Sequence, residues 1–255
     1  MSDVKSGFSI ERQGLDLRFR AAVLAEREWL APNYVRVRLT GSELAGFTSL
    51  GADDHMRLFF AVAPTSSVEE LRASPNREYT PLAWGDDWLD VEFAVHGDEA
   101  VGARWAASAP IGSFVGVGGP RGSAVLTGQP GSWLLAGDET AIPAIRRFAA
   151  MIPAAAPARI VVEVVSEADQ VDIDAPVTVE WLHRRDAPAG SALIAFLDDL
   201  DEPDAVGSDP FVFIAAEQSI VKPGRALLGR WGVDVSKAVV KGYWKRDEAE
   251  CHAPH

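Results

Sequence analysis

Residues 134–145 read Leu-Leu-Ala-Gly-Asp-Glu-Thr-Ala-Ile-Pro-Ala-Ile, an apolar run that meets a glycine turn and then the start of a helix. Pro143 falls in the first turn of that helix, where proline is tolerated. Asp138 or Thr140 is placed to cap it. Apolar strands that alternate with helices predict a parallel sheet covered on both faces. We expect strands at 133–136, 159–165, 178–182, 211–215 and 238–243, and helices at 140–151, 191–200 and 217–231.

The first half of the chain has the pattern of β-structure. Residues 34–39 alternate apolar and basic side chains, as a half-buried strand does. Turn residues separate the candidate strands, and one short helix is expected near 103–108. About six strands at such spacing predict a small antiparallel barrel. The expected strands are 15–24, 34–39, 56–62, 77–80, 88–95 and 114–119.

Length and composition allow two domains of ordinary size within the 255 residues. Residues 127–131, Thr-Gly-Gln-Pro-Gly, have the composition of a boundary, so we expect a β-barrel domain at 1–127 and an α/β domain at 128–255. The fold class is therefore β followed by α/β.

Charge and cysteine content exclude several kinds of protein. A net charge of −13 disfavours nucleic acid and anionic membrane as partners. The single cysteine, Cys251, rules out an intrachain disulfide and an all-cysteine metal centre. The first ten residues lack an apolar signal segment, and no apolar run reaches the roughly 20 residues that span a bilayer. We expect a cytoplasmic protein without membrane insertion, and no protein-bound metal.

The segment Arg77-Glu78-Tyr79-Thr80 carries the most specific chemistry of the first half. Arginine offers planar, permanently charged donors to a pyrophosphate. Tyrosine offers a flat apolar face with a polar tip, and a threonine hydroxyl can hydrogen-bond a ring nitrogen. These are the groups that a flavin dinucleotide requires, although an ordinary strand with alternating surface residues would have the same pattern.

Five blocks in order make the chain resemble the siderophore-interacting protein family, bacterial FAD proteins with a ferredoxin reductase-like fold. The resemblance covers nearly the whole chain, from about Leu17 to Arg246. The blocks are Asp54-His55-Met56-Arg57-Leu58, Arg77-Glu78-Tyr79-Thr80, Val95-His96-Gly97 with Arg104-Trp105-Ala106, residues 134–145, and Gly242-Tyr243-Trp244-Lys245.

The resemblance implies a set of cofactor-binding residues. Arg77 and Thr80 match the family's phosphate and isoalloxazine contacts, with Tyr79 against the ring. The family's phosphate-facing helix start corresponds to Ala100-Val101-Gly102-Ala103, where a hydroxyl is missing and the glycine has moved. His96 is equally well explained as a structural histidine, and for Trp105 a place in the core is favoured. The implied set is Arg77, Tyr79, Thr80, His96, Gly102, Ala103, Trp105, Asp138 and Thr140.

Three cations in separate blocks, Arg57, Arg121 and Lys245, resemble the basic triad with which the family holds anionic ferric siderophores. On an acidic protein such a patch would concentrate anionic chelates. The alternative is that the three face solvent separately.

The electron donor implied by the family is NADPH, NADH or a reduced ferredoxin. There is no Gly-x-Gly-x-x-Gly motif. Arg184 and Arg185 could bind a 2′-phosphate, or could be solvated loop charges. Ala216 replaces a glycine of the relatives and is expected to narrow a ligand cleft.

These features predict an oxidoreductase that contains FAD, is monomeric, and reduces Fe(III) in ferric siderophores so that Fe(II) is released, without a catalytic acid, base or nucleophile. Two alternatives stay open: a flavin reductase that serves another acceptor, and a siderophore-binding module without turnover.

Overall fold

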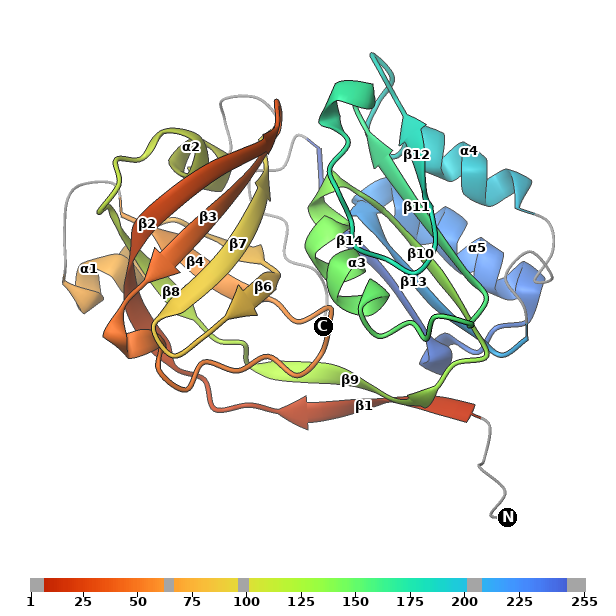
Figure 1. Cartoon of the computed structure of the whole chain (residues 1–255), viewed down its shortest axis with the longest axis horizontal. Helices are drawn as coiled ribbons and strands as arrows, with labels where there is room; N and C mark the ends of the chain where they lie inside the picture. Colours follow the sequence, from red (N-terminus) through yellow and green to blue (C-terminus); the bar gives the residue numbers. More distant parts are fainter. Residues whose placement is uncertain (1–6, 62–66, 96–100, 201–207, 247–255) are drawn as a thin grey trace. The chain divides into compact units, whose positions relative to one another are not determined.

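The computed structural model describes residues 7–61, 67–95, 101–200 and 208–246 (Figure 1). The chain forms two compact units, Arg12–Val125 and Leu126–His255, and Met1–Glu11 groups with the second. The predicted division follows residue 127, whereas that of the structure follows Val125. The first residues join the second unit because Phe8 of β1 (Gly7–Gly14) packs edge-on against Phe211, with ring centroids 5.9 Å apart.

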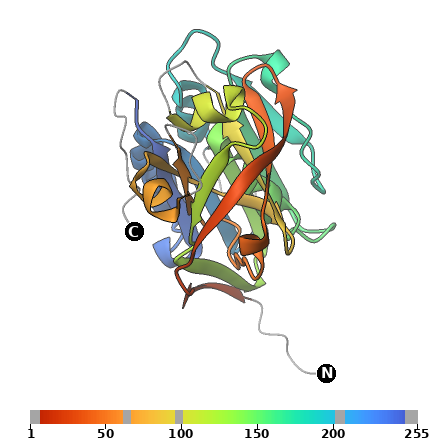
Figure 2. The same cartoon turned by 90° about the vertical axis from the view of Figure 1, so that its left-hand side faces the viewer.

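The first unit is a strongly curled antiparallel sheet with the strand order β5-β4-β8-β2-β3-β7-β6 (Figures 1 and 2). This confirms the barrel-like fold, but the sheet has seven strands instead of the predicted six. The additional strand, β6, is short, begins with proline and has no alternating pattern. The strands are β2 (Phe19–Ala31), β3 (Tyr34–Thr40), β4 (Met56–Phe60), β5 (Asn76–Tyr79), β6 (Pro81–Trp84), β7 (Trp88–Ala94) and β8 (Phe114–Gly118).

Strand β3 shows why this sheet forms. Val35, Val37 and Leu39 point into the barrel core and are fully buried. The alternate residues Arg36 and Arg38 lie on the other face and pair with carboxylates of β7, at 2.7 and 2.8 Å. The clean alternation in the sequence therefore marks the two faces of the strand.

Two helices accompany the sheet, α1 (Val68–Ala73) and α2 (Val101–Ser108). Helix α2 contacts β3, β4, β5 and β7, and it lies across one end of the curled sheet (Figure 1). Its buried residues include Trp105 and Ala106, which belong to the barrel core. The barrel is thus closed at this end by α2.

The second unit is a parallel sheet in the order β12-β11-β10-β13-β14. The five predicted strands and three predicted helices of this half are all present, although α3 and α5 each begin after a 3-10 turn. Helix α3 packs Phe148 on Phe211 and Phe213 of one face, whereas α4 and α5 pack on the face that carries Leu134, Val161 and Ile214. The bounds are β10 (Ser132–Asp138), α3 (Ile142–Ala149), β11 (Ala158–Val164), β12 (Val179–His183), α4 (Ser191–Asp199), β13 (Pro210–Glu217), α5 (Val221–Trp231) and β14 (Ala238–Trp244).

Strands β1 and β9 (Gly122–Gln129) form a separate two-stranded sheet. The residues expected to be an irregular boundary, 127–131, therefore begin as the end of a strand. Gly128 has φ +81°, and a Cβ there would lie 2.5 Å from the carbonyl oxygen of Gly7. The glycine is required by this close pairing rather than by a flexible linker.

No helix within the described part of the chain has the length and apolar character that crossing a membrane requires.

Candidate functional site

Thr80 occupies the point where the curled sheet nearly closes. It is the one residue between β5, which pairs with β4 at one edge of the sheet, and β6, which pairs with β7 at the other. Its side chain is 7% exposed, and among the described residues its hydroxyl has no hydrogen-bond partner. A hydroxyl in this state leaves a donor and an acceptor available to a ligand.

Arg77 and Tyr79 lie on β5 directly before this point. Arg77 is half-buried, and its guanidinium donates to the backbone oxygen of Asn76 at 2.7 Å. No carboxylate of the described residues pairs with it, so its charge is not neutralised within that part of the chain. Alternation places Arg77 and Tyr79 on the same side of β5.

The ring of Tyr79 packs against the barrel core. Its centroid lies 4.3 Å from that of Phe93 and 6.1 Å from that of Phe60. Burial raises the pKa of Tyr79 well above its ordinary value, so the phenol is neutral across the physiological range. The side chain as a whole is only partly buried, which leaves part of it for a ligand.

Helix α2 carries three of the predicted cofactor residues. Gly102 and Ala103 are buried in its first turn, and Trp105 is 8% exposed with its ring 5.4 Å from that of Phe60. Trp105 therefore serves the core, as the sequence favoured. His96 lies outside the described residues. Contact of these residues with a cofactor stays a prediction.

Two of the three predicted substrate cations, Arg57 and Arg121, belong to the barrel unit. Arg57 on β4 pairs with Glu78 at 3.3 Å, and its side chain is 40% exposed. In the ladder Arg57 lies opposite Gly118, three residues before the exposed Arg121. Lys245 is exposed and follows β14 in the other unit. The triad thus divides into a pair on the barrel and one cation on the α/β unit.

Asp54 fixes the backbone around that pair. Its carboxylate is 3% exposed and accepts hydrogen bonds from the Ser49 hydroxyl at 2.8 Å, the Gly51 amide at 3.1 Å and the Ser123 hydroxyl. Asp54 precedes β4, and Ser123 follows Arg121 by two residues. The carboxylate therefore ties the segment before Arg57 to the segment after Arg121.

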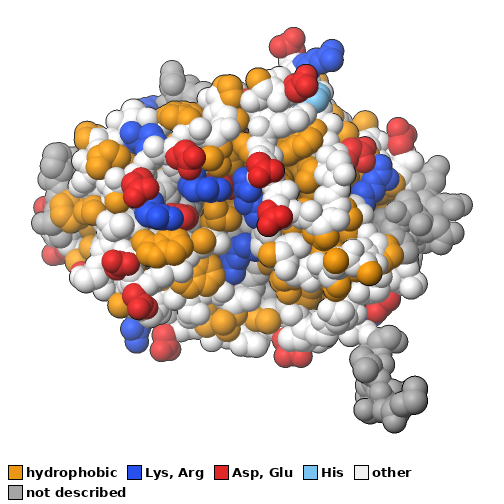
Figure 3. All heavy atoms as spheres, viewed as in Figure 1, with side chains coloured by type: hydrophobic (Ala, Val, Ile, Leu, Met, Phe, Trp, Pro, Cys, Tyr) orange, Lys and Arg blue, Asp and Glu red, His pale blue; other side chains and the backbone are white. Residues whose placement is uncertain are grey.

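The face of the barrel that Figure 3 shows alternates in charge instead of carrying a patch of one sign. Lys and Arg side chains lie directly beside Asp and Glu side chains over strands β2, β3 and β7 (Figure 3). The ion pairs Arg36–Glu92 and Arg38–Asp90 belong to these strands. Only a local excess of cations could therefore attract an anion.

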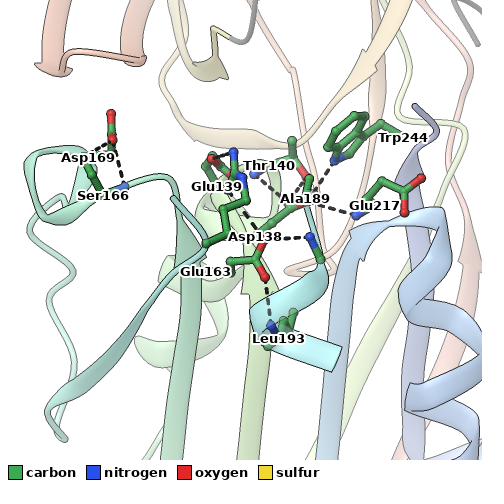
Figure 4. A network of polar contacts seen from close by, with 12 residues as sticks. Asp138, Glu139, Thr140, Glu163, Ser166, Asp169, Ala189, Leu193, Glu217 and Trp244 are labelled. Atoms are coloured by element: carbon green, nitrogen blue, oxygen red, sulfur yellow. Dashed lines mark hydrogen bonds and ion pairs between the residues drawn. The ribbon is translucent and has the colours of Figure 1, made fainter. Parts of the chain in front are cut away.

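Asp138 lies at the carboxyl end of β10, next to β13, where the strand order reverses. Its buried carboxylate accepts four hydrogen bonds: from the amide and hydroxyl of Thr140, from the amide of Glu217 at 2.9 Å, and from Nε1 of Trp244 at 2.8 Å (Figure 4). Ligands of open α/β sheets bind near such a reversal. Here Asp138 and Thr140, two predicted cofactor contacts, hydrogen-bond each other. Asp138, one of the two predicted capping residues, caps the 3-10 turn Glu139–Ala141 that precedes α3.

A buried ion cluster adjoins Asp138. Arg184 donates to both carboxylate oxygens of Glu139, at 2.9 and 2.6 Å, and lies 3.6 Å from Glu163. Glu163 accepts from the amides of Gly190 and Leu193 and so caps α4 (Figure 4). Arg184 is 8% exposed. Neither alternative given for Arg184, a 2′-phosphate contact or a solvated loop charge, fits this position, because the residue is buried and two carboxylates already occupy its guanidinium. Arg185 is exposed.

Desolvation sets the direction of the pKa shift for the two glutamates of this cluster but not for its arginine. Burial, followed by the neighbouring charge of Asp138, raises the pKa of Glu139 to about 7 despite its contact with Arg184. Burial also raises the pKa of Glu163. For Arg184 burial alone would lower the pKa, but the hydrogen bonds and charge of Glu139 outweigh it and raise the value.

Sequence reasoning missed Glu163, Glu217 and Trp244 as parts of this network. A signal existed for Glu163, because it is a single acidic residue within the apolar run of residues 160–165. A charge in a strand buried on both faces requires a partner. Nothing local pointed to Trp244, whose bond to Asp138 joins residues 106 positions apart.

At Gly137 the sequence suggests a place where a ligand could approach the backbone closely, because glycine has no side chain. A Cβ at Gly137 would lie 2.5 Å from Cβ of Ala141 and 2.7 Å from the oxygen of Ala215, so this glycine serves internal packing instead of ligand approach. Ala216 is fully buried in the core of the α/β unit. The expectation that its methyl group narrows a ligand cleft is therefore wrong.

Comparison with known proteins identifies the family. Residues 23–124 match the siderophore-interacting FAD-binding domain, and residues 131–247 match the siderophore-interacting protein model. The chain is 32% identical to the NADPH-dependent ferric-chelate reductase of Escherichia coli over 248 residues, covering 90% of this chain and 94% of the relative. The chain belongs to the siderophore-interacting protein family.

Other members agree with this assignment. The ferric vibriobactin reductase ViuB of Vibrio cholerae is 29% identical over 245 residues, which cover 88% of each chain. The crystal structure of a siderophore utilization protein from T. fusca has a TM-score of 0.81 and 31% identity, covering 96% of this chain and 98% of that one. The ferredoxin reductase of carbazole 1,9a-dioxygenase, 14% identical with a TM-score of 0.64, shares the fold alone. The predicted ferredoxin reductase-like fold of this siderophore-interacting protein is confirmed.

The residues of the barrel fit the FAD of a siderophore-interacting protein. At the near-closure of the sheet lie a half-buried arginine, a partly buried neutral phenol and the hydroxyl of the largely buried Thr80. Within the described residues the arginine has no carboxylate partner and the hydroxyl has no hydrogen-bond partner. These are donors for a pyrophosphate, a face for a ring and a hydrogen-bonding group for its edge.

Proposed function

We propose that this protein is an FAD-dependent oxidoreductase that reduces Fe(III) in ferric siderophores and so releases Fe(II). The observation that carries the proposal is the sequence of Arg77, Tyr79 and Thr80 at the near-closure of the barrel, within a domain of the siderophore-interacting FAD-binding family. The names of the relatives from Escherichia coli and Vibrio cholerae support the same reaction.

Each residue of this segment has a separate task. Arg77 would bind the pyrophosphate of FAD with its planar donors. Tyr79 would offer its face to the isoalloxazine, and the Thr80 hydroxyl would hydrogen-bond the edge of the ring. FAD supplies the redox chemistry, since it takes two electrons from a donor and passes them singly to iron. The chain itself binds, orients and excludes water, and needs no acid, base or nucleophile.

The cations Arg57, Arg121 and Lys245 would hold the substrate. Chelates of Fe(III) with catecholate or carboxylate groups are anionic, and positive potential raises their local concentration. Elsewhere on the protein, the net charge of −13 repels anionic chelates. Reduction to Fe(II) weakens the hold of hard oxygen ligands, so the iron is released once reduced.

NADPH is the donor that we favour, because the similar Escherichia coli protein is named as NADPH-dependent. Arg185 is exposed after β12 and is the arginine of this loop that a 2′-phosphate could reach, since Arg184 is buried in ion pairs. NADH and a reduced ferredoxin are the competing donors. We further propose that the protein is a monomer that acts in the cytoplasm.

Stopped-flow spectroscopy tests the function. The flavin-loaded protein is first reduced with NADPH, NADH or reduced ferredoxin, and is then mixed without oxygen with ferric chelates of different charge. We expect fast flavin reoxidation by anionic chelates, and a rate that falls about tenfold or more when Arg57, Arg121 and Lys245 are all replaced by glutamine. Equal rates with every chelate, unaffected by these substitutions, would favour a flavin reductase for another acceptor. Failure to bind FAD would favour a binding module.

A further inference from the structure

Arg27 fixes the carboxyl end of helix α2. Its Nε donates to the backbone oxygen of Ala106 and its Nη2 donates to that of Ala109. The last carbonyl groups of a helix have no partner within the helix and carry the negative end of its dipole, so a guanidinium there satisfies both. Among the described residues no carboxylate pairs with Arg27, and burial lowers its pKa. Within the described part of the chain, the Arg27 guanidinium therefore interacts with the carboxyl end of α2.

Gly102 fixes the other end of α2 against the flavin motif. A Cβ at this position would lie 1.9 Å from the hydroxyl oxygen of Tyr79, 2.9 Å from its Cζ and 3.1 Å from Cζ of Phe60. Glycine costs about 1 kcal/mol relative to alanine inside a helix. Its presence in the first turn is explained by this contact, because any other residue would push the tyrosine ring or the helix away.

Tyr79 is thus held between two walls. Phe93 contacts its ring at a centroid distance of 4.3 Å, and the backbone of Gly102 faces its hydroxyl. The position of the second wall depends on α2. Core packing of Trp105 and Ala106 holds this helix, and Arg27 holds its carboxyl end. A shift of α2 would therefore reach the ring directly through Gly102, and also through Phe60, whose ring lies near those of Trp105 and Tyr79.

We propose that Arg27 and Gly102 are positioning residues for FAD, which set the location of the Tyr79 ring by holding α2 against it. This inference rests on the proposed function, since it assigns Tyr79 to the flavin. It adds Arg27, which lies outside the family motifs, and it assigns Gly102 of the implied cofactor set a role that acts on the cofactor through the Tyr79 side chain.

The test measures FAD binding to the apoprotein by titration, together with the fluorescence yield of the bound flavin, which reports ring stacking. We expect Gly102→Ala to weaken FAD binding about tenfold and to raise the fluorescence of the bound flavin. Arg27→Ala should do the same, and Arg27→Lys should recover part of the affinity, since one ammonium can still reach a carbonyl group. Ser108→Ala is the matched control, because within the described residues that hydroxyl donates to the backbone oxygen of Arg104 in the same helix; it should bind FAD as the wild type does.

A double variant separates positioning from general destabilisation. Tyr79→Phe removes the nearest atom to the new methyl group, so Gly102→Ala combined with Tyr79→Phe should bind FAD more tightly than the sum of the two single losses predicts. Additive losses would overturn the inference, as would wild-type affinity and fluorescence in Gly102→Ala and Arg27→Ala. A lower melting temperature with unchanged flavin fluorescence would assign both residues to stability alone. Absence of FAD binding by the wild type would instead refute the proposed function.

Discussion

Nε1 of Trp244 donates to Oδ2 of Asp138 at 2.8 Å, a hydrogen bond that joins the end of β14 to the end of β10 across the intervening strand β13. The amide of Glu217 at the end of β13 donates to the same oxygen at 2.9 Å. One carboxylate oxygen therefore joins the carboxyl ends of three neighbouring strands, and open α/β sheets bind ligands at this edge. Lys245, the proposed substrate cation of this unit, directly follows the fastened residue.

Replacing Trp244 with phenylalanine removes the indole donor and keeps an aromatic ring. We expect the α/β unit to lose about 1 to 3 kcal/mol of stability, since the lost bond goes to a charged, buried acceptor. Hydrogen exchange of the amides in β10 and β13 measures the loss. Trp29→Phe is the control, because Trp29 is 47% exposed and lies in the barrel unit; a change within about 0.5 kcal/mol is expected there. Equal effects of both substitutions would contradict the role of the bond.

Adjacent arginines offer a second comparison. Arg184→Met leaves Glu139 and Glu163 buried without their cation, and should destabilise the α/β unit by about 3 to 5 kcal/mol. Arg185→Met changes an exposed side chain and should leave stability within about 0.5 kcal/mol. Urea unfolding of the two variants measures the difference. Similar midpoints would show that the buried cluster contributes little.

The ionisation of Glu139 predicts a pH dependence with a definite sign. Its pKa is raised from 4.5 to about 7, so between these values the folded protein holds a proton that the unfolded chain has released. The stability that Glu139 contributes therefore falls as pH rises from 4.5 to about 7 and is constant above. Relative to Glu139→Gln, the wild type should lose up to about 3 kcal/mol across this window, at 1.36 kcal/mol for each pKa unit. Unfolding series of both proteins at several pH values measure it, and parallel profiles would refute it.

Glu78 limits the positive charge of the proposed substrate pair. It lies 3.3 Å from Arg57 and 3.9 Å from His55. Glu78→Gln should strengthen the binding of anionic ferric chelates by about two- to fivefold at low salt, with the gain lost at high ionic strength. Arg57→Gln should weaken the binding of anionic chelates, and the affinity for a neutral chelate should change with neither substitution. Chelate titrations of the flavin-loaded proteins at two salt concentrations decide, provided that FAD content is unchanged.

The sequence was most informative where patterns are local. The alternation of residues 34–39 predicted a half-buried strand, and Val35 and Val37 lie in the core with Arg36 on the other face. The five strands of the parallel sheet and its three helices were predicted within a few residues, whereas β1 and β9 were not predicted. β6 was missed because four residues that begin with proline carry no periodic signal. The segment that nearly closes the sheet was therefore recognised by its chemistry and not by its place in the fold.

Roles that depend on distant partners could not be predicted. Arg184 and Arg185 are adjacent in sequence and identical in type, yet one is buried between carboxylates and the other is exposed. Asp138 was assigned to a cofactor because its neighbours match a family motif, whereas its four donors come from three separate elements. The preference of a side chain for a ligand or for the protein itself is decided by such long-range contacts.

The position of Thr80, alone between β5 and β6, has a consequence for the stability of the protein before it binds FAD. β5 and β6 each have one neighbour in the ladder, so both rims of the sheet are free to fray. A cofactor bound at Thr80 would contact both edge strands, β5 and β6, and its binding free energy would add to the stability of the whole barrel. Proteolysis of the empty protein should therefore begin at these two strands, and scarcity of flavin would shorten the lifetime of the chain itself. Limited digestion with and without FAD would reveal this dependence.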